Sequence, residues 1–225
     1  MLYDGARCGQ TPLVQWFEPS YWHALGAAEE TAGGRGTVTF MRHGKRPWVL
    51  RHYRRGGAIA RLVRDRYFWI GERRTRAFAE WRLLHELAGR GLPVPAPVAA
   101  RYLREGPAYT ADLITEELPT RVTLAQAMLA GKLPPARWQE VGACIARFHS
   151  EGVHHADLNA HNVLLGRNHV VYLVDFDRGR IEARGAWEEA VLARLQRSLQ
   201  KVSREDGPGA FGAQQWQWLR EGYAR

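Results

Sequence analysis

The chain has 225 residues, 45% of them hydrophobic, which suits one compact unit or two small lobes. No apolar stretch approaches the roughly 20 residues of a membrane span, the N-terminus lacks the apolar segment of a secretory signal, and two cysteines, Cys8 and Cys144, are too few for a disulfide framework. We therefore expect an intracellular chain with reduced cysteines, whose net charge of +9 indicates an anionic partner.

A glycine-containing turn and a β-hairpin are predicted first. Gly34, Arg35 and Gly36 precede two strand-like runs, residues 37–41 and 48–53, which a turn separates. Glycines let backbone N–H groups approach phosphate oxygens closely. The run lacks the full G-x-G-x-x-G pattern, so a flexible turn is the alternative to a phosphate-binding loop.

Arginines and aromatic side chains are interspersed over residues 51–76, where Tyr67, Phe68 and Trp69 interrupt the arginines. This combination suits an anionic membrane face or nucleic acid, and a solvated arginine-rich surface is the third interpretation. No helix-turn-helix, zinc-finger or RNP-type signature accompanies the segment. We therefore expect no nucleic-acid partner.

A helix is predicted over residues 75–88, before the glycines and prolines that follow. Its apolar stripe consists of Ala77, Trp81, Leu84 and Leu87. Glu80 lies on the same stripe, so its carboxylate is turned inward and needs a cationic partner.

Strands over residues 99–103 and 109–114 come next, followed by a connector around Glu117. Helices are then predicted over residues 123–129, 135–151, 186–199 and 214–223. The second of these helices has its apolar face formed by Trp138, Val141, Ile145 and Phe148.

The candidate catalytic and metal-binding residues lie between the predicted helices 135–151 and 186–199. The apolar runs 163–165 and 170–174 flank a turn, so they are predicted to pair antiparallel and to bring Asn162 and Asp175 together. Oxygen ligands converging there suit Mg²⁺, and Asp157 lies just upstream as a candidate base. This is the outline of a phosphoryl-transfer site. The alternatives are a polar surface hairpin and a metal site built from His155, Asp157 and His161.

The segment from His155 to Asp177 resembles the catalytic and metal-binding segments of the protein kinase superfamily. His155-Ala156-Asp157 through Asn162 follows the H-R-D-x-x-x-x-N pattern, and Asp175-Phe176-Asp177 stands in place of D-F-G. The resemblance implies that Asp157 accepts the proton of the acceptor hydroxyl and that His155 supports the loop. It also implies that Asn162 and Asp175 hold Mg²⁺. Asp177, where the pattern has glycine, is either a further ligand or a solvated charge.

The same resemblance gives roles to the N-terminal half. It implies that Gly34, Arg35 and Gly36 act as a glycine-rich loop and that the backbone near Glu117 meets the adenine ring. It also implies that Glu80 pairs with Arg51, which stands where kinases have a lysine. A guanidinium can grip a carboxylate and still reach phosphate. Lys45 is the fallback for the phosphate contact, although it lies in the predicted turn.

The fold class implied is α+β, a two-lobed protein-kinase-like fold that binds ATP and Mg²⁺ between its lobes. Residues 1–117 would form an antiparallel sheet with one helix, and residues 118–225 a mainly helical lobe with the catalytic loop. No activation segment is recognisable before residue 186, which argues against a regulated protein kinase.

Four further stretches resemble the bacterial 3-deoxy-D-manno-octulosonic acid (Kdo) kinase family: VLRHYRRGG (49–57), DRYFWIGERRTRAFAEWRLL (65–84), GLPVPAPVAARY (91–102) and RGRIEARGAW (178–187). The resemblance implies ATP-dependent phosphorylation of the Kdo sugar of Kdo–lipid A, at its 4-hydroxyl, during lipopolysaccharide core synthesis. It further implies a peripheral location on the cytoplasmic face of the inner membrane, an anionic surface that suits the arginines.

Several alternatives stay open at this point. They are a lipopolysaccharide heptose kinase, a small atypical protein kinase, an antibiotic phosphotransferase and a non-catalytic nucleic-acid-binding module. The presence of Asp157, Asn162 and Asp175 together argues against the last. The sequence gives no oligomeric state.

Overall fold

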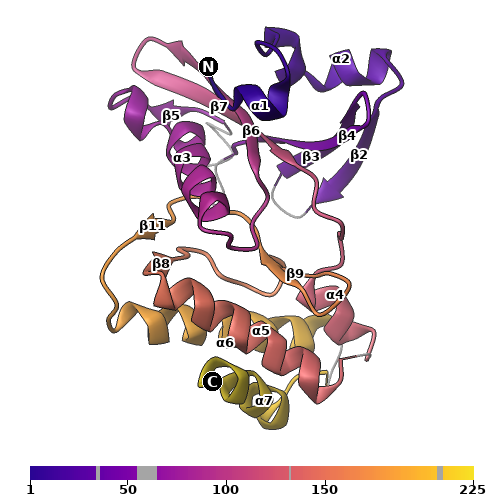
Figure 1. Cartoon of the computed structure of the whole chain (residues 1–225), viewed down its shortest axis with the longest axis vertical. Helices are drawn as coiled ribbons and strands as arrows, with labels where there is room; N and C mark the ends of the chain where they lie inside the picture. Colours follow the sequence, from indigo (N-terminus) through magenta and orange to yellow (C-terminus); the bar gives the residue numbers. More distant parts are fainter. Residues whose placement is uncertain (34–35, 55–64, 132, 207–209) are drawn as a thin grey trace. The chain divides into compact units, whose positions relative to one another are not determined.

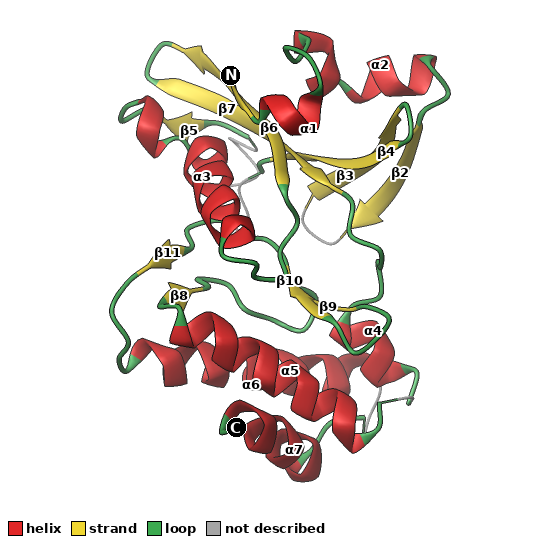
Figure 2. Ribbon diagram, in the orientation of Figure 1, coloured by secondary structure: helices red, strands yellow, loops and turns green. Residues whose placement is uncertain are grey.

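The computed structural model describes residues 1–33, 36–54, 65–131, 133–206 and 210–225. The chain divides into two compact units, the first made of Met1–Glu86 with Pro95–Glu117 and the second of Leu87–Val94 with Leu118–Arg225. Figures 1 and 2 show an antiparallel sheet in the first unit and mainly helices in the second. The predicted α+β fold class is confirmed.

The sheet of the first unit is antiparallel throughout. Its strand order is β1 (Leu2–Tyr3), β6 (Pro97–Glu105), β7 (Ala108–Glu116), β4 (Arg46–His52), β3 (Gly36–His43) and β2 (Ala28–Gly33), with β5 (Tyr67–Phe68) paired to β7. The predicted hairpin is β3–β4, whose register pairs His43 with Arg46 across a turn where Gly44 has a φ of 63°. The other predicted pair is β6–β7.

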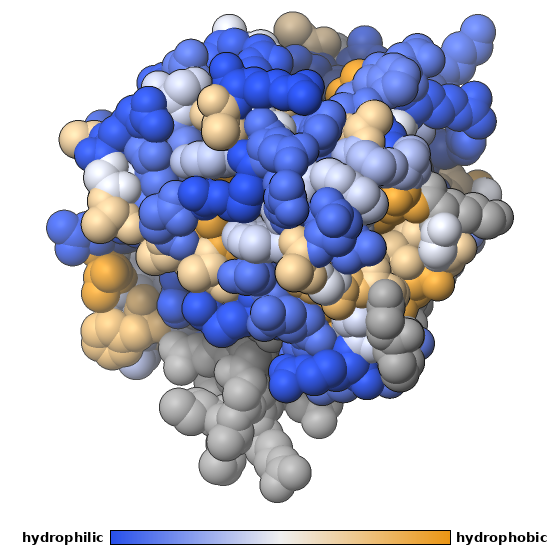
Figure 3. Space-filling view, turned by 90° about the horizontal axis from the view of Figure 1, so that it is seen from below, coloured by the Kyte–Doolittle hydropathy of each residue, from blue (hydrophilic) through white to orange (hydrophobic). Residues whose placement is uncertain are grey.

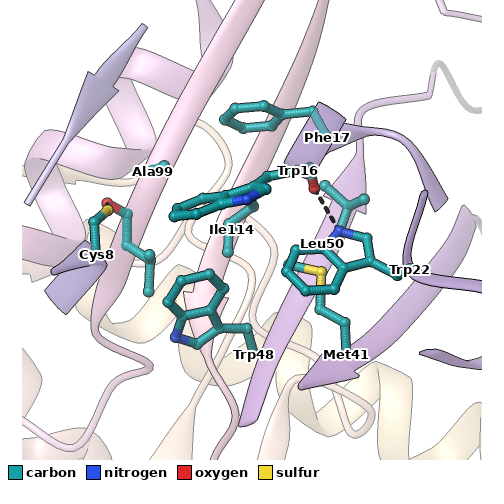
Figure 4. Close-up of a cluster of buried hydrophobic side chains, with 10 residues drawn as sticks. Cys8, Trp16, Phe17, Trp22, Met41, Trp48, Leu50, Ala99 and Ile114 are labelled. Carbon is teal, nitrogen blue, oxygen red and sulfur yellow. Dashed lines mark hydrogen bonds between the residues drawn. The ribbon is translucent and has the colours of Figure 1, made fainter. Parts of the chain in front are cut away.

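One face of the sheet is covered by an N-terminal segment for which no element was predicted. It contains α1 (Gly5–Cys8), a 3₁₀ turn (Val14–Phe17) and α2 (Pro19–Ala24). These elements are too short to show a helical period in the sequence. They deliver aromatic side chains into a buried cluster with β4, shown in Figure 4, where the indole N–H of Trp22 donates to the Trp16 carbonyl over 2.8 Å.

The opposite face of the sheet carries α3 (Arg76–Gly89), whose predicted stripe is buried. The ring of Phe78 on this helix meets that of Tyr102 on β6 with centroids 5.2 Å apart. Because successive strand residues point to opposite faces, Leu50 joins the aromatic cluster while its neighbour Arg51 points to α3. The alternation of β4 therefore puts Arg51 on the same side as Glu80.

The second unit is built on helices α4 (Leu124–Leu129), α5 (Pro135–Ser150), α6 (Trp187–Asp206) and α7 (Ala213–Tyr223). Helices α5 and α7 cross closely: a Cβ at Gly222 would lie 1.9 Å from the Gln139 carbonyl oxygen, and one at Gly142 would lie 2.0 Å from that of Leu219. Glycine is required at both positions for this contact. The C-terminal helix is thus docked on α5.

Two small sheets complete the second unit, β9 (Val163–Leu165) with β10 (Val171–Leu173) and β8 (Val153–His154) with β11 (Arg180–Ile181). In the described parts of the chain, no helix combines the length and apolar character needed to cross a bilayer. The face shown in Figure 3 is mostly hydrophilic, with smaller apolar patches between the polar residues.

Candidate active site

The β9–β10 hairpin forms as predicted and brings the ends of the motif together. Its register pairs Leu173 with Val163, and beyond that pair the N–H of Val174 donates to the Asn162 carbonyl over 3.0 Å. The turn has positive φ at both Asn168 (52°) and His169 (64°), as in a type I′ hairpin turn. The residue after Val174 is Asp175. The hydrogen bond from Val174 therefore holds the backbone of Asn162 next to the residue that precedes Asp175.

His155 connects the loop of residues 155–162 to this hairpin. Its ring is buried, with Nδ1 accepting the N–H of Asp157 over 3.2 Å and Nε2 lying 2.9 Å from the carbonyl oxygen of Val174. Nε2 therefore carries the proton and donates to Val174. Burial lowers the pKa of His155 from its ordinary value, which favours the neutral ring that these two contacts require.

The alternative metal site built on His155 and His161 is not supported. Both ring nitrogens of His155 are engaged by backbone groups, so neither can ligate an ion without breaking the loop. Among the residues that the structure describes, no three His, Cys, Asp or Glu side chains gather as a metal-binding group.

Asp157 sits in a loop fastened through its own backbone. Its carbonyl accepts the side-chain amides of Asn159 and Asn162, each over 2.9 Å, and the neighbouring Leu158 is fully buried. The Asp157 carboxylate is about one-third exposed and pairs with Arg194 of α6, whose Nε lies 2.9 Å from Oδ1. The backbone of the loop is therefore held by hydrogen bonds, while the carboxylate of Asp157 is partly exposed to solvent.

Asp175 holds an unusual backbone conformation, with φ of 65°. Left-handed geometry is uncommon for residues other than glycine, although aspartate and asparagine tolerate it best, and it concentrates at functional sites. Phe176 is fully buried, with its ring 4.6 Å from that of His155. The other positive φ in this segment, 62°, falls on Arg178. Asp177, which replaces the expected glycine, has no such strain.

The donor set at this end of the hairpin fits a hard cation. The Asn162 side-chain nitrogen is engaged by the Asp157 carbonyl, which leaves the amide oxygen as the group that a cation would meet. Amide and carboxylate oxygens, with water and phosphate oxygens filling the remaining positions, are what Mg²⁺ prefers. That Asn162, Asp175 and Asp177 act as ligands stays a prediction.

In the first unit, Glu80 lies beneath the sheet with a side chain only 2% exposed, and it forms the predicted ion pair with Arg51. The Tyr53 hydroxyl donates to Glu80 over 2.5 Å and accepts from Arg51 Nη2 over 3.0 Å. The Arg51 side chain stays 24% exposed. Lys45 is exposed in the β3–β4 turn.

Of the other residues predicted to contact the nucleotide, the structure describes Glu117 and Gly36. The N–H of Glu117 donates to the Pro47 carbonyl over 3.0 Å, so an adenine contact made by Glu117 would use its carbonyl. Gly36 begins β3, opposite Gly33 of β2. Gly34 and Arg35, which connect these strands, lie outside the described residues.

We expect Arg51→Ala and Glu80→Ala each to weaken ATP use, and the double variant to cost less than the sum, because one removed partner leaves the other uncompensated. A double-mutant cycle on KM for ATP should give a coupling of about 0.5–3 kcal/mol. Arg82→Ala, on the exposed side of the same helix, is the control. Additive effects would contradict the pairing and make Lys45 the next candidate.

Three contributing residues were missed in the sequence. Tyr53 completes the Glu80 pair, and Arg194 and Ser198 of α6 contact the loop of residues 155–162. The alternation of β4 could have placed Tyr53 on the face of Arg51. Nothing in the sequence separates Arg194 from the other arginines of its helix.

Comparison with known proteins matches residues 20–223 to the model of the lipopolysaccharide kinase (Kdo/WaaP) family. A protein from Xylella fastidiosa (strain 9a5c) named 3-deoxy-D-manno-octulosonic acid kinase is 45% identical, covering 91% of this chain and 82% of the relative. Proteins of the same name from Stenotrophomonas maltophilia and Xanthomonas axonopodis pv. citri are 46% and 48% identical, covering 91% and 92% of this chain and 82% and 84% of their own lengths.

Proposed function

Because this chain belongs to the lipopolysaccharide kinase (Kdo/WaaP) family, we propose that it transfers a phosphoryl group from ATP to a hydroxyl of the Kdo sugar of Kdo–lipid A. The 4-hydroxyl is the proposed position. The observation that carries the proposal is the loop of Asp157, which His155 fastens to Val174, the residue before Asp175. The relatives named Kdo kinase supply the acceptor.

Asp157 is the proposed base. Its carboxylate orients the acceptor hydroxyl and takes its proton as the oxygen attacks the terminal phosphorus of ATP and the bond to the departing ADP breaks. His155 and the amides of Asn159 and Asn162 keep the loop in place for this step. Asn162 and Asp175 would hold Mg²⁺, with Asp177 as the candidate third ligand, and the ion would supply positive charge against the phosphates.

Nucleotide binding is proposed for the sheet of the first unit. Arg51, held by Glu80 and Tyr53 with its side chain 24% exposed, suits a phosphate oxygen because a guanidinium can serve a carboxylate and a phosphate together. Gly36, with Gly34 and Arg35, is the proposed phosphate loop, and the Glu117 carbonyl the proposed adenine contact.

The proposal is tested by incubating the purified protein with labelled ATP and, separately, Kdo–lipid A, a generic protein and an aminoglycoside. We expect label in the lipid alone, because the chain carries a net charge of +9 and repels polycationic aminoglycosides. Label in the protein or the aminoglycoside would contradict it.

An anionic membrane surface is the proposed second partner. Phe68 and Ile70 are 68% and 58% exposed, far more than such side chains usually are, and Leu103 is 48% exposed. Arg104 lies with its guanidinium 3.9 Å from the centroid of the Trp69 ring. Beside them is a hollow of about 540 Å³, lined by Ile70, Gly71, Glu72, Arg73, Arg74 and Arg82.

Apolar side chains ringed by arginines suit an interface where acyl chains meet anionic headgroups. The part of the basic segment between residues 55 and 64 lies outside the described residues. The proposed peripheral location, on the cytoplasmic face of the inner membrane, rests on this surface and on the proposed acceptor.

We expect the double variant Phe68→Ser/Ile70→Ser to bind vesicles containing phosphatidylglycerol at least tenfold more weakly, since each apolar side chain gains ~1.5–3 kcal/mol on full burial and about 1.4 kcal/mol already corresponds to a tenfold change. KM for the lipid acceptor should rise while KM for ATP stays unchanged. Co-sedimentation with vesicles measures the binding, and added salt should weaken it. Leu25→Ser, which removes a side chain 59% exposed, is the control. Equal binding by both variants would refute this surface.

A further inference from the structure

The carboxylate of Asp157 is held by a guanidinium from outside its own loop. Arg194 of α6 directs both Nε and Nη2 to the same oxygen, Oδ1 of Asp157, with Nε at 2.9 Å. Residues 155–162 contain no lysine or arginine. The positive charge beside the proposed base is therefore supplied by a helix that lies more than 30 residues further along the chain.

Helix α6 is a firm support for this contact. Leu192, Leu195 and Leu199 are fully buried and anchor it in the second unit. One turn beyond Arg194, Ser198 Oγ accepts the N–H of Ala160 over 3.1 Å, so the helix holds the loop at a second point. Arg194 itself is 47% exposed on its side chain, which leaves it open to the bulk solvent and to a substrate.

A cation beside the base favours phosphoryl transfer. The carboxylate that takes the hydroxyl proton stands beside an anionic phosphoryl group, and like charges at such distances repel. A guanidinium held on the carboxylate offsets that repulsion while remaining charged at every working pH. Two donors on one oxygen also restrict rotation of the carboxylate, which fixes the direction in which it meets the acceptor.

We propose that Arg194 is a positioning residue for the phosphoryl transfer, acting through Asp157. It orients the carboxylate toward the acceptor hydroxyl and offsets its charge while the new oxygen–phosphorus bond forms and the bond to ADP breaks. The proton passes from the hydroxyl to Asp157, and Arg194 neither gives nor takes one. This assignment rests on the proposed function.

The test compares Arg194→Gln with Arg197→Gln, which removes the same charge from an exposed position one turn away on the same helix. We expect Arg194→Gln to lower kcat roughly ten- to a hundredfold, with ATP affinity and Tm within error of the control. Arg194→Lys should recover part of kcat, because lysine restores the positive charge but not the paired donors of the planar guanidinium. If Arg194→Gln turns over like Arg197→Gln, the proposal is overturned.

A structural role would give a different result. Ser198→Ala removes the second contact between α6 and the loop without touching Asp157. If Arg194 only stabilises the loop, Arg194→Gln should match Ser198→Ala in Tm and in kcat. The wild type and Arg194→Lys should then also have similar kcat values. That result would overturn the proposal.

The same variants also test the role of Arg194 if the acceptor is not Kdo–lipid A. Asp157 would act on whichever hydroxyl the enzyme uses, so the same variants are compared on the acceptor that wild-type protein labels, or on slow hydrolysis of ATP by water if it labels none. Failure of the Kdo assignment shows in the wild-type product, whereas failure of the Arg194 assignment shows in the ratio between Arg194→Gln and Arg197→Gln.

Discussion

Replacing Asp157 with alanine should lower the rate of phosphoryl transfer by roughly 10²- to 10⁴-fold, the usual contribution of a positioned general base. Nucleotide binding should survive, because the carboxylate meets the acceptor hydroxyl rather than ATP. The loop should also survive, since its fastenings use the Asp157 backbone: the carbonyl accepts from Asn159 and Asn162, and the N–H donates to His155. Steady-state kinetics and nucleotide titration separate the two effects.

Asp157→Asn is the matched variant, because it keeps the size of the side chain and removes its charge. Both variants should keep the Tm of the wild type, since the carboxylate is one-third exposed and its pair with Arg194 lies at the surface. An Asp157→Ala protein that loses ATP affinity as severely as rate would show that the residue serves the nucleotide, and the assignment as base would then be wrong.

Replacing Asp175 with asparagine should weaken Mg²⁺-dependent nucleotide binding at least tenfold and reduce turnover with it. The substitution isolates charge from backbone strain, because Asp175 has a φ of 65° and asparagine tolerates that conformation as well as aspartate does. An amide oxygen is a weaker ligand for Mg²⁺ than a carboxylate. Titration of ATP binding with Mg²⁺ gives the measurement.

Asp177→Asn is the informative companion to that variant. If Asp177 is a ligand, its substitution should shift the same Mg²⁺ titration in the same direction, and if it is a solvated charge the titration should stay where it is. An unchanged Mg²⁺ titration for Asp175→Asn itself would contradict the metal site.

Much of the site could be predicted because its chemistry is local in sequence. The hairpin of β9 and β10 follows from two apolar runs around a turn, and Asn162 flanks it by necessity. The inward position of Glu80 follows from helical periodicity, which placed it on the buried stripe of α3. These inferences needed only spacing and alternation.

The features that were missed depend on tertiary contact. Trp16 and Trp22 belong to elements of four and six residues, too short for a periodic signal, and they are recognised only when the sheet is there to cover. Arg194 is one of several arginines on α6, and only the fold brings it to Asp157. Asp177 stands at the glycine position of the pattern, but the left-handed conformations of this segment fall on Asp175 and Arg178.

Cys8 is buried and Cys144 partly buried, and both contact backbone carbonyls. Cys8 Sγ lies 3.5 Å from the Val98 carbonyl and Cys144 Sγ 3.3 Å from that of Val171. Burial raises the pKa of Cys8 to about 11 and that of Cys144 to about 12, so both remain thiols and poor nucleophiles at neutral pH. Neither competes with Asp157 for a catalytic assignment.

The position of the product phosphate tests most directly whether the protein phosphorylates the Kdo sugar. Kdo–lipid A extended with heptose is incubated with ATP, Mg²⁺ and the purified protein, and the product is fragmented by tandem mass spectrometry. We predict one added phosphate, retained on the Kdo fragment and absent when Asp157→Ala replaces the wild type. A phosphate on heptose, or none on the lipid, would contradict the account.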